Sequence, residues 1–119
     1  MRSSDQEIID FLNQLIKLGQ EIIAESDKQQ KKVLIENYVS KLQEIIEWPH
    51  MNQINPLLTM RIKNFETAPF IAYLKDLPLT KYSFGIFKSS VSDADKFINQ
   101  QIAKTELGLE AIRYFYKNK

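Results

Sequence analysis

The chain has 119 residues, of which 44% are hydrophobic and 26% charged, and its 16 basic and 15 acidic side chains give a net charge of +1. This balance excludes a disordered chain, and no stretch approaches the roughly 18 uninterrupted apolar residues of a membrane-spanning helix. Cysteine is absent, which excludes disulfides, thiolate nucleophiles and cysteine-ligated metals. We therefore expect one soluble domain, 1–119. The first residues turn acidic where a signal peptide would be apolar, so no secretory segment is expected and the cytoplasm is the default expectation.

The first helix is predicted to start at a capping box formed by Ser4 and Glu7. The apolar residues that follow fall on two interleaved tracks, which is typical of a helix that faces two neighbours. Gly19 takes a vacant place on the second track. The two tracks are Ile8, Phe11, Leu15, Leu18 and Ile22, and Ile9, Leu12, Ile16 and Ile23.

A second helix over 27–47 is predicted from a repeat of the capping pattern at Ser26 and Gln29, and it should form an antiparallel hairpin with the first. Pro49 ends this helix, because proline disfavours helical geometry in the residue before it. The side chains expected to face inward are Ile35, Tyr38, Val39, Leu42, Ile45 and Ile46.

All four prolines lie in the central part of the chain, between residues 49 and 78. Pro56 and Pro69 stand near the first helical position of two predicted short helices, 56–65 and 68–76. Residues 79–88 alternate like a strand, yet no partner strand is evident, so we favour a third short helix there.

A long C-terminal helix is predicted from Ser92 onward. A second apolar track, Ala103, Leu107, Ala111 and Tyr114, is expected to widen its inward face. The inward track itself is Ala94, Ile98, Ile102, Thr105, Leu109, Ile112 and Tyr116. The predicted fold is therefore an all-α, single-domain helical bundle with an N-terminal antiparallel hairpin, two or three short central helices and one long C-terminal helix.

The residues needed for common catalytic sites are missing. His50 is the single histidine, no serine lies in a G-x-S-x-G setting, and the three glycines are too isolated to form a phosphate-binding loop. We therefore expect a protein without catalytic residues, metal or cofactor, and not an enzyme.

Three arrangements of acidic residues could supply the chemistry of a metal site or of acid–base catalysis. Glu47 and His50 have the Glu-x-x-His spacing of di-iron bundles, but the motif occurs once and Pro49 interrupts its helical turn. Two carboxylate pairs offer acid–base chemistry, but each lies at a predicted helix start, which already explains it. These pairs are Glu25 with Asp27 and Asp93 with Asp95.

The aromatic residues gather in the second half of the chain and lead to the preferred functional hypothesis. Tyr114, Phe115 and Tyr116 are consecutive, so they point about 100° apart around a helix and cannot all face one core. Together with Phe84 and Phe87 they are predicted to form a protein-binding surface. The chain would then act as an inhibitor, immunity protein, chaperone or adaptor, with another protein or a second copy as partner.

The alternative hypothesis is a nucleic-acid-binding regulator. Residues 1–48 hold six basic and nine acidic groups, whereas residues 49–119 hold ten and six, and aromatic residues are interleaved with the cations of segment 61–88. An isoelectric point near 7.9 argues against it. The cations that would contact phosphate are Arg61, Lys63, Lys81 and Lys88.

Overall fold

The architecture is known from a computed structural model that describes residues 3–47, 65–79 and 91–118. Four helices and no strand occur in these residues: α1 (Ser3–Ala24), α2 (Lys28–Glu47), α4 (Ala68–Leu74) and α5 (Val91–Lys117). The predicted all-α bundle, with its N-terminal hairpin and long C-terminal helix, is confirmed.

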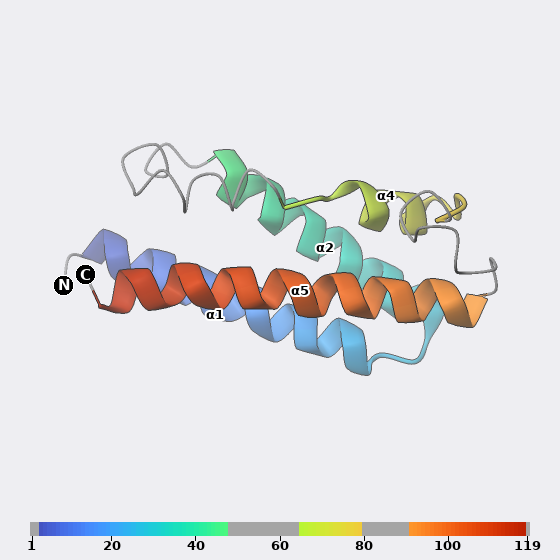
Figure 1. Ribbon diagram of the computed structural model, residues 1–119, viewed down its shortest axis with the longest axis horizontal. Helices are drawn as coiled ribbons and strands as arrows, with labels where there is room; N and C mark the ends of the chain where they lie inside the picture. The colour runs from blue at the N-terminus through green and yellow to red at the C-terminus, as the bar shows by residue number, and fades with distance from the viewer. Residues whose placement is uncertain (1–2, 48–64, 80–90, 119) are drawn as a thin grey trace.

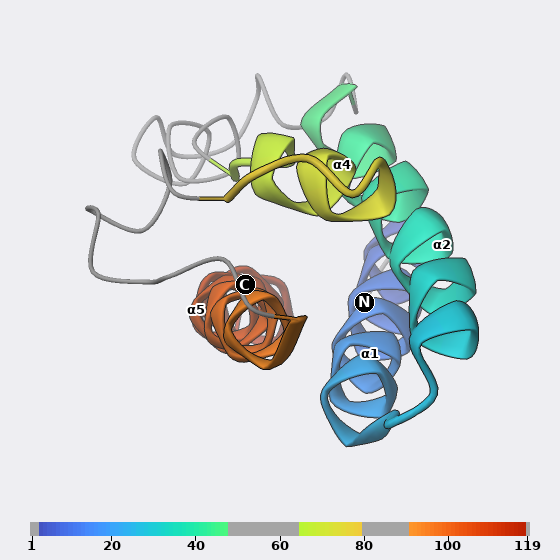
Figure 2. The same ribbon diagram turned by 90° about the vertical axis from the view of Figure 1, so that its right-hand side faces the viewer.

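The other two long helices, α2 and α5, pack against α1. Helix α5 runs antiparallel along one side of α1, and α2 folds back along another, so the start of α1 and the end of α5 lie at the same end of the bundle (Figure 1). Helix α4 packs against both α2 and α5 (Figure 2). In the described part of the chain, α1 therefore holds α2 and α5 together, and α4 covers the side of the bundle that lies between them.

The start of α2 is capped by Asp27. Its side-chain Oδ2 accepts a hydrogen bond from the backbone N–H of Gln30 at 3.2 Å, and its carbonyl accepts from that of Lys31 at 2.8 Å. The sequence pattern predicts the cap at Ser26, and the structure has it one residue later, at Asp27. Two adjacent residues of capping type make such a shift easy, because either side chain can reach an amide of the first turn.

The apolar tracks of α1 and the inward residues of α2 form most of the core, as predicted. Two residues of α1 differ from the prediction: Phe11 is only partly buried, and Ile23 is 40% exposed. The inward track of α5 is also confirmed, with Ala94 and Thr105 half-buried at its edges. The fully buried residues come from all four helices and include Leu12, Leu15, Ile22, Ile35, Tyr38, Leu42, Phe70, Ile98, Ile102 and Leu109.

The second track of α5 does not widen its buried face, and this prediction is wrong. Ala103, Leu107 and Tyr114 are exposed, and Ala111 is half-buried. Seven residues separate Leu107 from Tyr114, so both point about 140° to 160° away from the buried Leu109 around the helix. The described helices that pack against α5, α1 and α4, leave this side uncovered.

Helix α4 lies within the predicted range 68–76, with Pro69 in its first turn, and ends at Leu74. Asp76 causes the earlier end, because its φ of 56° leaves the right-handed helical region. The predicted helix at 56–65 lies outside the described residues except for Phe65, which is not helical, and the one at 79–88 lies outside them except for Leu79.

Gly19 marks the closest approach between the long helices. A Cβ atom at this position would lie 2.9 Å from Cγ2 of Ile102 on α5 and 3.2 Å from Cε1 of Tyr38 on α2. Since Ile102 and Tyr38 are both fully buried, neither can move aside without disturbing the core.

We expect Gly19→Ala to lower the free energy of unfolding by about 1 to 2 kcal/mol. Overpacking typically costs about 1 to 3 kcal/mol, and the better helix propensity of alanine returns up to about 1 kcal/mol. Gly19→Val should cost more, whereas the exposed Gln14→Ala on the same helix should change stability by less than about 0.5 kcal/mol. Urea unfolding checks the series, and a stabilised Gly19→Val variant would contradict it.

Candidate functional site

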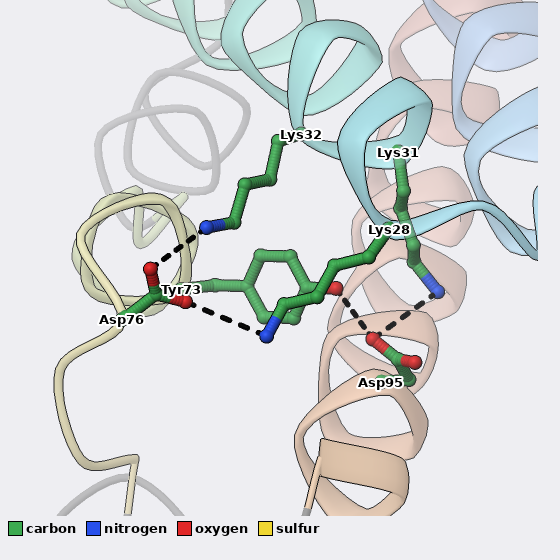
Figure 3. A network of polar contacts seen from close by, with 6 residues as sticks. All are labelled: Lys28, Lys31, Lys32, Tyr73, Asp76 and Asp95. Atoms are coloured by element: carbon green, nitrogen blue, oxygen red, sulfur yellow. Dashed lines mark hydrogen bonds and ion pairs between the residues drawn. The ribbon is translucent and has the colours of Figure 1, made fainter.

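Charged and polar side chains from three helices meet at one end of the bundle (Figure 3). Helix α2 contributes its first turns, α4 its last residues and the position just after it, and α5 its beginning. We call this group the lysine–aspartate cluster, and its members are Lys28, Lys31, Lys32, Tyr73, Asp76 and Asp95.

Lys31 lies deepest in the cluster and is 3% exposed. Its ammonium donates a hydrogen bond to Oδ1 of Asn99 at 2.9 Å and lies 3.9 Å from Oδ1 of Asp95. Burial lowers the pKa of Lys31, and the negative charge of Asp95 opposes this shift. The lysine therefore joins α2 to α5 with its charge partly compensated.

Asp95 also holds α4. Its Oδ1 accepts a hydrogen bond of 2.5 Å from the hydroxyl of Tyr73, which is itself buried. Burial raises the pKa of Tyr73, and the bond to the Asp95 carboxylate raises it further, so the phenol stays protonated. Its place at the start of a helix is the explanation that the sequence offers for Asp95, and the structure adds partners on α2 and α4.

Asp76 closes the cluster on its exposed side. At the C-terminal end of α4, the N–H of Asp76 donates a hydrogen bond to the carbonyl of Tyr73, and the N–H of Leu77 donates one to the carbonyl of Ala72. This pattern is the Schellman motif, in which glycine usually takes the left-handed position. Here the position is occupied by an aspartate, whose carboxylate lies 2.8 Å from Nζ of Lys32 and 3.5 Å from Nζ of Lys28. The conformation at the end of α4 thereby places the negative charge of Asp76 beside two lysines of α2.

The other residues considered for acid–base or metal chemistry either make local contacts or lie outside the residues that the structure describes. Oε2 of Glu25 accepts a hydrogen bond from the backbone N–H of Asp27 at 3.2 Å, so this pair lies at the start of α2, as expected. Glu47 is exposed at the end of α2, and His50 and the side chain of Asp93 lie outside the described residues. Among the residues that the structure describes, no three histidine, cysteine or acidic side chains come together as a possible metal site.

The three consecutive aromatic residues divide as their spacing requires. Tyr114 is 70% exposed, Phe115 is half-buried, and Tyr116 is 2% exposed in the core, where its ring meets that of Phe115 edge-on. Tyr116 is therefore not available to a partner. The other predicted contact residues, Phe84 and Phe87, lie outside the described part of the chain, as do the four cations of the nucleic-acid hypothesis, Arg61, Lys63, Lys81 and Lys88.

Tyr114 instead belongs to an exposed apolar row on the outer side of α5. Leu107 lies two turns before it and is 68% exposed, and the exposed Ala103 lies one turn before Leu107. We call these three residues the α5 stripe. The sequence pattern shows this row and predicts that it widens the inward face of the helix, and it places Tyr114 in the binding surface as well; the angular distance from Leu109 is the signal that the row lies on a different side of α5.

Comparison with known proteins gives no match to a family model, a curated protein or a solved structure. None of the described helices has the length and apolar character needed to cross a membrane. The interpretation of the chain therefore depends on its own geometry.

We expect Tyr73→Phe to lower the free energy of unfolding by about 1 to 2 kcal/mol, because it removes a hydrogen bond to a carboxylate from a buried side chain. Tyr114→Phe is the matched control, since the hydroxyl of an exposed tyrosine can bond to water in either state. It should change stability by less than about 0.5 kcal/mol. Equal effects of the two substitutions in urea unfolding would contradict the role given to the bond.

The contribution of Asp76 to the stability of the folded chain should depend on pH. The hydrogen bond from Lys32 and the charges of Lys32 and Lys28 hold the pKa of Asp76 below its usual value of 3.8. A lowered pKa in the folded state means that the stabilisation is present above 3.8 and is lost as the pH falls below that value.

We therefore expect Asp76→Asn to lower the thermal midpoint at pH 7, and the difference from the unmodified chain to shrink below about pH 4. Asparagine tolerates the left-handed conformation, so the comparison isolates the charge. The exposed Glu44→Gln on α2 serves as control. A difference at Asp76 that stays constant down to pH 2 would show that the carboxylate charge has no part in it.

Proposed function

We propose that this protein acts by binding another protein, in the manner of an inhibitor, immunity protein, chaperone or adaptor, and that the α5 stripe is its contact surface. The observation that carries the proposal is the exposure of two large apolar side chains, Leu107 at 68% and Tyr114 at 70%, on one face of one helix.

The spacing of the stripe suits a helix-sized contact. Leu107 and Tyr114 are seven residues apart, so they lie about 10 Å apart along the helix and within about 20° of each other around it. Ala103 extends the row by one more turn, and its small side chain allows a partner backbone to come close. Tyrosine is also among the residues that most often dominate binding energy at protein interfaces.

The surroundings of the stripe have the polar character of an interface rim. Lys96, Gln100, Lys104 and Lys117 are exposed on α5, and Glu110 is half-buried. A solvated rim around a small apolar centre is the usual arrangement of a non-obligate protein interface. The stripe offers this arrangement without any change in the bundle core, because its residues point away from α1.

The stripe is tested by Leu107→Glu combined with Tyr114→Glu. Val33→Glu is the matched control, because Val33 is 61% exposed but stands on α2, away from the stripe. All positions are exposed, so both variants should unfold close to the midpoint of the unmodified chain. A partner recovered from the native host by the unmodified chain is then purified, and its affinity for each chain is measured by calorimetry.

We expect the stripe variant to bind the partner at least about tenfold more weakly, which corresponds to about 1.4 kcal/mol, and the Val33→Glu chain to bind it normally. Sedimentation of the chain alone detects a second copy as the partner. The proposal fails if the stripe variant keeps both the partner and the oligomeric state of the unmodified chain, or if the unmodified chain is a monomer that binds no protein.

A further inference from the structure

Helix α4 differs from the other three described helices in how it depends on its surroundings. Seven residues are too few for a helix that is stable by itself in water. The long helices contact one another through α1 without it, and α4 lies across the side where α2 and α5 face each other (Figure 2). Its helical form is therefore supported by the surface that it covers.

Two aromatic side chains anchor α4 to that surface. Phe70 and Tyr73 are three residues apart, about one turn, and are 1% and 3% exposed. The ring of Phe70 meets the ring of Tyr38 on α2 edge-on, with centroids 5.7 Å apart. The hydroxyl of Tyr73 reaches Asp95 on α5. One turn of α4 thus contacts both helices of the surface.

A charged contact completes the attachment from outside the core. Asp76 takes a left-handed conformation that costs an L-residue about 1 kcal/mol or more, and in this conformation it pairs with Lys28 and Lys32. Its side chain is 61% exposed, so the pairs are in reach of solvent and salt. Apolar anchors one turn apart, combined with a charge at the end of the helix, are features by which a groove recognises an amphipathic helix.

We propose that the surface under α4 is a receptor for a short helix of another protein, and that α4 is its internal occupant. The surface consists of Lys28, Lys31, Lys32 and Tyr38 of α2 and Asp95 of α5, and we call it the α4-docking face. The partner helix carries two aromatic residues three positions apart and a carboxylate three positions after the second, as α4 does with Phe70, Tyr73 and Asp76. This inference is independent of the α5 stripe and goes beyond it.

Displacement of α4 is tested with a fluorescent synthetic peptide of residues 65–79 and the full-length chain. In the unmodified chain the tethered α4 competes with the peptide, so binding should be weak. Asp76→Lys in the chain places a third ammonium beside Lys28 and Lys32, which weakens the internal helix but leaves the docking face intact. We expect this chain to bind the peptide about fivefold or more tightly than the unmodified chain, measured by fluorescence anisotropy.

Charge exchange shows whether the peptide occupies the face of α4. A peptide with Asp76→Lys should lose the gain in affinity, whereas a chain with Lys28→Glu and Lys32→Glu should prefer this peptide to the unmodified one. Glu44→Lys in the chain is the matched control for Asp76→Lys, because it makes the same change of charge at an exposed site of α2, and this chain should bind the peptide as the unmodified chain does.

The proposal is overturned if the Asp76→Lys chain, shown to be folded by circular dichroism, does not bind the peptide more tightly than the unmodified chain. It is also overturned if the aspartate and lysine peptides bind that chain equally. Adding Leu107→Glu and Tyr114→Glu to the Asp76→Lys chain should leave peptide binding unchanged. Failure of the α5 stripe as a contact surface would therefore be distinguishable from failure of the α4-docking face.

Discussion

The absence of a side chain at Gly19 allows Tyr38 of α2 and Ile102 of α5 each to approach the backbone of α1 closely. This approach lies where α1 contacts both α2 and α5. The ring of Tyr38 also meets the ring of Phe70 edge-on, and this aromatic contact joins α4 to α2. Gly19, Tyr38 and Phe70 thus link three helices in one line of contacts, and Ile102 adds the fourth. The position of the exposed Asp76 depends in turn on where Phe70 lies.

The lysine–aspartate cluster compensates the positive charge at the start of α2. Its first residues include three lysines and no acid, although the amide dipoles at a helix start favour negative charge. The N-cap Asp27 supplies one such charge locally, and Asp76, which follows α4, and Asp95 of α5 add two more from elsewhere in the chain. A buried ion pair adds little net stability, since desolvation of the two charges offsets their attraction. Lys31 instead fixes the register of α2 against α5, because it must reach both Asn99 and Asp95. An apolar contact would not specify this register as strictly.

The two surfaces proposed for binding differ in what they offer a partner. The α5 stripe is already exposed, so a partner gains contact without displacing any described part of the chain. The α4-docking face is covered, so a partner must compete with the tethered α4. The apparent affinity of the partner is therefore its intrinsic affinity multiplied by the fraction of time that the face is free. Both surfaces place a tyrosine on the same helix as exposed or partly exposed lysines, but Tyr114 of the stripe lies in the second half of the chain, whereas the lysines and Tyr38 of the α4-docking face belong to α2 in the first half.

The sequence by itself determined the helical class, the hairpin, the ranges of the long helices to within a few residues and most of the core, because these follow from apolar periodicity, caps and prolines that act locally. It also required that one of Tyr114, Phe115 and Tyr116 be exposed. It could not show which side of α5 has neighbours, since Leu107 and Ala103 are apolar whether covered or not. Only the tertiary structure decided that this side is bare and that Lys31, Tyr73 and Asp95 meet, because such contacts join residues far apart in the chain and leave no periodic pattern along it.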